Sequence, residues 1–150
     1  SVAVLQAGRF KGSTIAFSER LPDERGHHTG WMWVNDKPRT LYLTNIDGFD
    51  ITDAAPLRDG GLVVLERRFR WTEGVRMRLR LLRAGEIAPG AVMQGEVLLQ
   101  ADMNYQIDNM EAVAVHQGAR GETVVTILSD DNFNPLLQRT VLLQFTLHED

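Results

Sequence analysis

Five acidic residues stand at places in the chain where they could share one cation: Asp53, Glu66, Glu111, Asp130 and Asp131. A ligand set made only of carboxylate oxygens favours a hard cation such as Ca²⁺ or Mg²⁺. A cation held in this way polarises an ester and lowers the pKa of an attacking water. These residues therefore predict a metal site, with Ca²⁺ as the expected cofactor. Glu66, Glu111 and Asp130 are the candidate catalytic groups within it.

The same acids also have a structural interpretation, which the sequence leaves open. Acids at strand ends often cap turns, and a glutamate beside an arginine often forms an ion pair. The run from Asp130 to Pro135 also lacks the central glycine and the closing glutamate of a helix–loop–helix calcium site. A metal site and a set of structural ion pairs are both compatible with the pattern.

Arginine is dense between residues 67 and 83, where Arg67, Arg68, Arg70, Arg76, Arg78, Arg80 and Arg83 lie. A guanidinium group binds phosphate or carboxylate through paired donors, so Arg67 and, further along the chain, Arg139 are the candidates that bind an anionic substrate. For most of the dense segment we expect a solvated face on which the arginines pair with nearby acids.

Other kinds of chemistry find little support. The chain has no cysteine, no Gly-x-Ser-x-Gly nucleophile motif and no phosphate-binding P-loop motif. His27 and His28 fall in a polar stretch that we expect to be a solvated loop. The three tryptophans, Trp31, Trp33 and Trp71, are expected to pack in the core or between sheets.

The elements that must position these residues are predicted to be strands. In residues 75–81, apolar side chains alternate with arginines, which is typical of a half-buried antiparallel strand. Short apolar runs separated by turn residues predict further strands at 3–5, 14–18, 31–34, 40–44, 61–66, 97–100, 112–116, 123–129 and 140–147.

The strands fall into three repeating segments, at residues 3–20, 52–67 and 111–131. Each has an apolar strand, a turn and a second apolar strand that closes on an acid. Such a unit buries its faces only by stacking on its neighbours, as the blades of a β-propeller do. We therefore predict one all-β domain of β-propeller type over residues 1–150, with about three blade-like antiparallel repeats. It is expected to be the C-terminal portion of a larger propeller, with self-association if the ring is truncated.

The charge and hydropathy of the chain argue against two kinds of partner, nucleic acid and the membrane interior. The formal net charge is −4, which argues against nucleic acid as a partner because that affinity rests on clustered positive charge. No apolar run reaches the roughly 18 residues that span a bilayer, so no transmembrane segment is expected. The chain opens at Ser1 directly on a strand-like run, and we expect a processed or truncated start.

Three stretches carry a resemblance to a known family: residues 48–53 with 65–69, residues 109–115, and residues 129–145, of which 129–140 is the most specific. The sequence resembles the C-terminal part of the phytase-like domain, also called esterase-like activity of phytase. The resemblance implies a propeller, a periplasmic or secreted location and hydrolysis of a phosphate or carboxylate ester. A non-catalytic propeller that binds a ligand or a protein is the alternative, because fold alone does not decide function.

Overall fold

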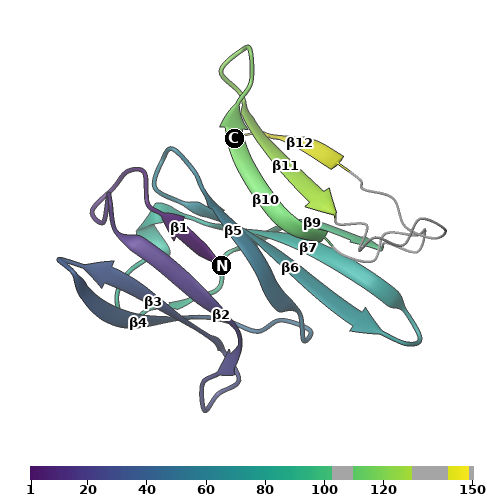
Figure 1. The fold of residues 1–150 in the computed structure, drawn as a ribbon, viewed down its shortest axis with the longest axis horizontal. Coiled ribbons are helices and arrows are strands. Elements are labelled where there is room, and N and C mark those ends of the chain that lie inside the picture. The colour runs from purple at the N-terminus through teal and green to yellow at the C-terminus, as the bar shows by residue number, and fades with distance from the viewer. Residues whose placement is uncertain (103–109, 130–141, 149–150) are drawn as a thin grey trace.

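The computed structural model describes residues 1–102, 110–129 and 142–148, which form three sheets (Figure 1). Sheet A has the order β1 (Val2–Val4), β2 (Thr14–Pro22), β3 (His28–Val34), β4 (Lys37–Leu43), β8 (Val92–Met93). Sheet B has the order β5 (Asp50–Pro56), β6 (Leu62–Arg70), β7 (Gly74–Leu82), β9 (Glu96–Asp102). Sheet C has the order β10 (Met110–Gln117), β11 (Thr123–Ser129), β12 (Leu142–Leu147). All neighbouring strands are antiparallel except β4 and β8.

The three sheets correspond to the three predicted repeats, and the prediction of an all-β, propeller-type fold is confirmed. The first strands of the repeats, β1, β5 and β10, lie innermost, and β5 contacts both of the others. In each sheet, the strands that follow in the chain lie progressively further from this inner strand. Whether further sheets complete a ring stays a prediction.

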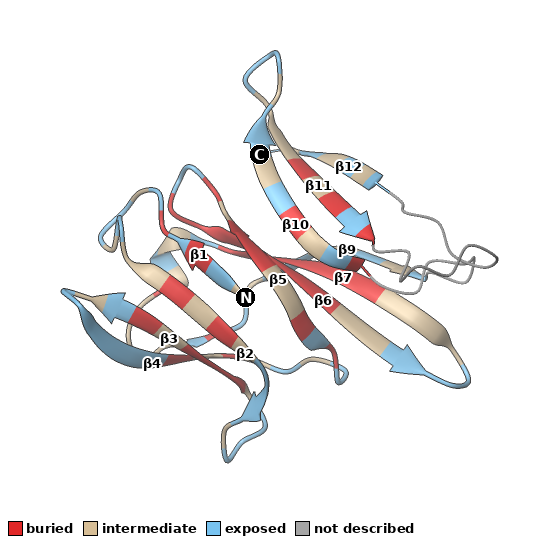
Figure 2. Ribbon diagram, viewed as in Figure 1, coloured by how far each residue is buried: buried red, intermediate tan, exposed pale blue. Residues whose placement is uncertain are grey.

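Sheet B lies in the middle of the stack, and both of its faces are buried (Figure 2). Successive side chains of a strand point to opposite faces. Leu62 and Val64 of β6 accordingly pack in the core shared with sheet A. Val63 and Leu65 pack in the core shared with sheet C. A strand buried on both faces reads as a continuous apolar run, and residues 62–65 are such a run.

Two tight hairpins set the strand registers. Asn35 and Asp36 both have positive φ, 51° and 62°, as a two-residue type I′ turn requires, and they connect β3 to β4. The β6–β7 hairpin turns about Thr72, so residues equally distant from Thr72 lie opposite each other. This second register decides which acid meets which arginine. Within the described residues, helical structure is limited to a 3₁₀ turn at Ala84–Glu86, and no helix there is long and apolar enough to cross a membrane.

Candidate functional site

Glu66 lies at the centre of a buried charge network between sheets A and B. Its Oε2 accepts a hydrogen bond from Arg78 Nε at 2.6 Å, and its Oε1 accepts from Arg80 Nη2 at 2.7 Å and Nε at 3.0 Å. The three side chains are at most 1% exposed. Both carboxylate oxygens of Glu66 are therefore engaged by guanidinium groups.

The two arginines also hold the chain segment that leads from sheet A to sheet B. Arg80 donates to the Thr44 carbonyl at 2.5 Å and to the Gln94 carbonyl at 3.0 Å. Arg78 donates to the Ile46 carbonyl at 2.9 Å, and its guanidinium lies 4.0 Å from the centroid of the Phe49 ring. Burial lowers the pKa of Arg80, and the charge of Glu66 opposes that effect. The network thus fixes the two sheets relative to each other.

This network corrects the expectation for the arginine-rich segment. Arg70 and Arg83 are exposed as expected, but Arg78 and Arg80 are buried rather than solvated. Their face of β7 is covered by the segment after β4, which sequence periodicity does not reveal. The pairing of Glu66 with Arg78 could have been predicted from the sequence, because the two residues are equally far from Thr72 at the centre of the hairpin. Glu66 pairs across the hairpin rather than with its neighbour Arg67.

His28 is the second departure from expectation. It lies in β3 and is 6% exposed, so the prediction of a solvated loop is wrong for it. Its ring hydrogen-bonds the backbone of Phe49, and its Nε2 has no partner in the described structure. Burial lowers the pKa of His28, which holds the ring neutral beside the charge network. His27, half-buried, instead places Nδ1 3.0 Å from Asp23 Oδ2.

Two inner strands carry the same irregularity near their first residues. The register of β5 shifts between Ile51 and Asp53, and that of β10 shifts between Met110 and Ala112. Thr52 and Glu111 are the extra residues of these two equivalent bulges. We call the place where β5 and β10 begin, opposite Arg67 of β6 and Ser129 of β11, the inner-strand edge. Bulges re-aim side chains and are frequent beside functional sites.

The described acids are distributed along this edge rather than gathered at one point. Asp53 Oδ2 accepts a hydrogen bond from the Val113 backbone N–H at 3.0 Å, which links sheet B to sheet C. Glu111 is exposed at its bulge, whereas Glu66 is enclosed by its arginines. Within residues 1–102, 110–129 and 142–148, no three histidine, aspartate or glutamate side chains are grouped to hold a metal. The described residues therefore do not assemble a cation site by themselves.

The remaining predicted residues divide into two groups. Asp130, Asp131 and Arg139 lie outside the described residues, so the predicted metal site and half of the predicted substrate site stay predictions. Arg67 is half-buried and lies opposite Asp50 in the β5–β6 register. Asp130 follows Ser129 directly, and Ser129 pairs with Met110 at the start of β10. Of the predicted acids that the structure describes, Asp53 and Glu111 lie at or next to the two bulges.

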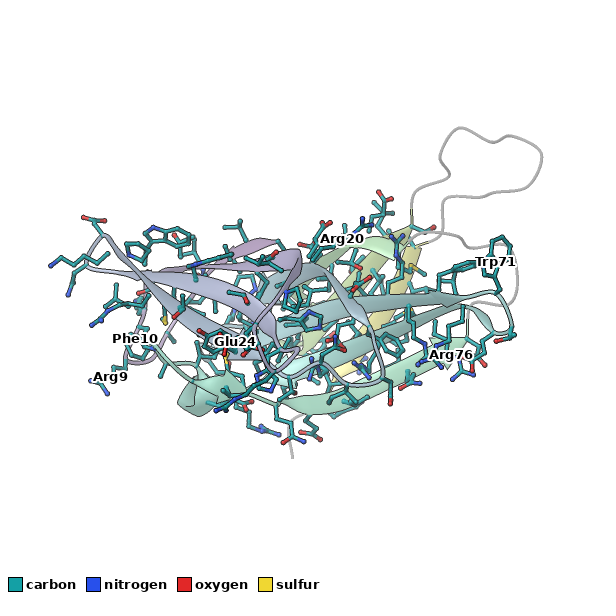
Figure 3. The ribbon with its side chains drawn as sticks, turned by 90° about the horizontal axis from the view of Figure 1, so that it is seen from below. Arg9, Phe10, Arg20, Glu24, Trp71 and Arg76 are labelled. Atoms are coloured by element: carbon teal, nitrogen blue, oxygen red, sulfur yellow. The ribbon has the colours of Figure 1, made fainter. Side chains whose placement is uncertain are left out.

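The β6–β7 hairpin extends from the same edge and carries positive charge. Residues 67–76 contain four arginines and one glutamate, Glu73. Glu73 Oε2 lies 2.7 Å from Arg68 Nη2, and Arg76 Nε lies 2.7 Å from Asp102 Oδ1. Trp71 is 93% exposed at the tip, so the expectation that it packs in a core is wrong (Figure 3). Its ring meets that of Phe69 edge-on, with centroids 5.4 Å apart.

A hollow of about 310 Å³ lies at the opposite end of the inner strands. Pro56 of sheet B and Arg58 of the turn after β5 line it on one side, and Val115 and Thr123 of sheet C line it on the other. It contains none of the predicted acids.

A protein-family model matches most of the chain. The model of the family described as phytase-like, esterase-like activity of phytase, matches residues 4–133. The chain belongs to the phytase-like family. The resemblance inferred from the sequence is thereby confirmed. The match spans sheet A from Val4 onward, all of sheet B and the first two strands of sheet C. No curated protein and no solved structure is significantly similar to the chain.

Proposed function

We propose that this phytase-like protein hydrolyses a phosphate or carboxylate ester at the inner-strand edge. The observation that carries the proposal is the family match over residues 4–133, which includes both equivalent bulges and the acids beside them. The positive charge of residues 67–76 supports an anionic substrate. In this proposal Arg67 and Arg139 bind the anionic group, because paired guanidinium donors match its oxygens.

The described geometry divides the acids between two roles. Glu66 already accepts hydrogen bonds from two arginines, so its role is to hold β6 and β7 in register beneath the edge. Exposed Glu111 has the accessibility that a general acid or base needs. A Ca²⁺ ion, if bound, would have to take ligands from Asp130 and Asp131 together with Glu111 or Asp53. It would supply charge neutralisation and polarisation of the ester. We further propose an exported location, periplasmic or secreted, as the family resemblance implies.

The test is hydrolysis of p-nitrophenyl phosphate and of p-nitrophenyl acetate, each in excess EDTA and in millimolar Ca²⁺. We expect hydrolysis of at least one ester, with a loss of kcat/KM of about tenfold or more in Glu111→Gln. Arg67→Gln should raise KM, whereas Arg83→Gln should not, since Arg83 lies at the other end of β7 and pairs with Glu96. A higher thermal midpoint in Ca²⁺ than in EDTA would show that the folded state binds the cation.

The second candidate function is a non-catalytic binding module. It is favoured by the enclosed Glu66 and by the lack of a three-acid group within the described part of the chain. Failure of both esters to react, in EDTA and in Ca²⁺, would favour this module over the hydrolase.

A further inference from the structure

The hollow of about 310 Å³ lies where the innermost strands of all three sheets end. β5 lies beside both β1 and β10 (Figure 1), and each of the three strands contributes to the lining at its C-terminal end. Gln6 lies just after β1, Pro56 is the last residue of β5, and Gln117 is the last residue of β10. The hollow is therefore built from equivalent ends of the three repeats, at the opposite end of β5 and β10 from the inner-strand edge.

The walls of the hollow combine apolar surface with a hydroxyl group. Val115 and Thr123 line it from sheet C, and each lies two residues from a residue of the same strand, Val113 or Val125, that packs in the core shared with sheet B. Side chains two residues apart in a strand point to the same face, so Val115 and Thr123 face sheet B. Pro56 lines the hollow from sheet B. Apolar walls with a few polar groups are typical of small-molecule sites.

Arg58 gives the hollow its charge. Of the described residues that line it, Arg58 alone carries a formal charge at pH 7, with His116 taken as neutral. Within the described part of the chain, the exposed side chain of Arg58 makes no hydrogen bond and no ion pair. In sheet B, by contrast, Arg78 and Arg80 are both paired with Glu66. The donors of Arg58 are thus available to a ligand, and guanidinium donors match the oxygens of a carboxylate or phosphate group.

Two acids lie nearby, in an adjoining hollow of about 390 Å³ that Arg58 also lines. Asp59 Oδ1 accepts a hydrogen bond from the Gly61 N–H at 2.8 Å, and Glu122 Oε2 accepts one from the Arg120 N–H at 2.8 Å. Among the described side chains, neither acid forms an ion pair with Arg58. Their charge disfavours an anion in the adjoining hollow, so the hollow between Pro56 and Val115 is the better site for one.

We propose that this hollow binds a small organic anion. Its carboxylate or phosphate group accepts hydrogen bonds from the Arg58 guanidinium and the Thr123 hydroxyl, and its apolar body lies against Pro56 and Val115. The volume is at the lower end of the range of about 300–1,000 Å³ that small-molecule sites occupy. The site is separate from the inner-strand edge, so it does not depend on the ester hydrolysis proposed there.

The experiment is a heteronuclear NMR titration of the isotope-labelled chain with benzoate and with phenylphosphonate, neither of which contains an ester bond. We expect saturable shifts of the amide signals of Gln6, Arg58, Gln117 and Thr123. The two probes separate a carboxylate site from a phosphate site. Neutral benzamide, which has the same ring and no charge, should bind more weakly than benzoate.

Arg58→Gln should raise the Kd about tenfold or more, because it removes the charge-assisted hydrogen bonds to the anion. Arg58→Lys keeps the charge but lacks the paired donors, so it should raise the Kd by less. The spectra of the unliganded variants show whether each is folded.

Arg120→Gln is the matched control. Arg120 lies in the turn between β10 and β11, is exposed and is not among the residues that line the hollow, so its replacement removes the same charge close by. It should leave the Kd nearly unchanged. An equal loss of binding in Arg58→Gln and Arg120→Gln would overturn the proposal, because general positive charge would then hold the anion. So would the lack of any saturable shift, or benzamide binding as tightly as benzoate.

The position of the shifts separates this site from the proposed catalytic one. Shifts confined to residues near the two bulges, such as Asp53 and Glu111, would overturn the site at Arg58 and assign the anion to the inner-strand edge. Shifts at the hollow in a chain that hydrolyses neither test ester would support this site while the proposed hydrolysis failed.

Discussion

Replacing Glu66 by glutamine tests whether the buried network stabilises the fold or serves a cation. Glu66→Gln keeps the shape of the side chain, removes its charge and leaves Arg78 and Arg80 buried without their counter-ion. Breaking a buried ion pair by removing one partner costs about 3–5 kcal/mol, because the remaining charge stays desolvated. For a domain of this size about 1 kcal/mol corresponds to about 2–4 °C. We therefore expect the thermal midpoint to fall by about 6–20 °C.

The matched control is Glu96→Gln. Glu96 pairs with Arg83 at 2.9 Å, close to the distances in the network, but the two side chains are 59% and 71% exposed. An exposed pair contributes about 0–1 kcal/mol, so the control should lower the midpoint by a few degrees at most. Urea denaturation in EDTA measures both variants as free energies of unfolding. Equal losses in the two variants would refute the reasoning from burial.

A second variant separates charge imbalance from lost packing. Glu66→Gln combined with Arg80→Met removes one acid and one of its two bases, so the buried excess charge returns to its original value. We expect the double variant to recover part of the stability lost in Glu66→Gln, because an apolar replacement of a buried pair is often close to neutral. If Glu66 were instead a cation ligand, its replacement would matter in Ca²⁺ and have little effect in EDTA.

Two further predictions follow from buried polar groups. Because the pKa of His28 is lowered from its ordinary 6.5 in the folded state, stability should be full above pH 6.5 and fall as pH drops toward the folded-state pKa. The free energy of unfolding should change with pH by up to about 1.4 kcal/mol per pH unit. Urea titrations between pH 7.5 and 5.5 measure this pH dependence. It should be lost in His28→Gln and kept in the control His116→Gln, because His116 is exposed. Asp53→Ala should cost about 1–3 kcal/mol, since the Val113 N–H loses its acceptor, whereas Asp53→Asn keeps an acceptor oxygen and should cost less in the same urea assay. A Ca²⁺-induced rise in midpoint that disappears in Asp53→Asn would assign Asp53 to the cation rather than to Val113.

Much of the architecture could be predicted because strand periodicity is a local property. The strand at Thr123–Ser129 has the predicted bounds, and the predicted 75–81 strand is one residue longer at each end in the structure. The three repeats became three sheets because each repeat is one antiparallel unit that needs neighbours to bury its faces. The family match over residues 4–133 confirms the resemblance drawn from short stretches of sequence.

The burial and the partners of individual side chains were harder to predict from the sequence. Alternation places Arg78 and Arg80 on one face of β7, but it cannot tell whether that face meets water or another segment. The segment that contains Thr44 and Ile46 covers that face, although these residues lie 36 and 32 residues before the arginines that they bind. His28 and Trp71 were misjudged for the same reason, since exposure depends on what packs nearby and both sit in polar stretches of sequence.

The sequence by itself determined most of the strands, the turns between them and the three repeats. These follow from local conformational preference and from spacing along the chain. Only the tertiary structure decided that Glu66 is enclosed by two arginines and that His28 is buried beside them. Those features depend on contacts between segments far apart in the sequence, and the free energy of a charge or an apolar surface is set by what those contacts exclude from water.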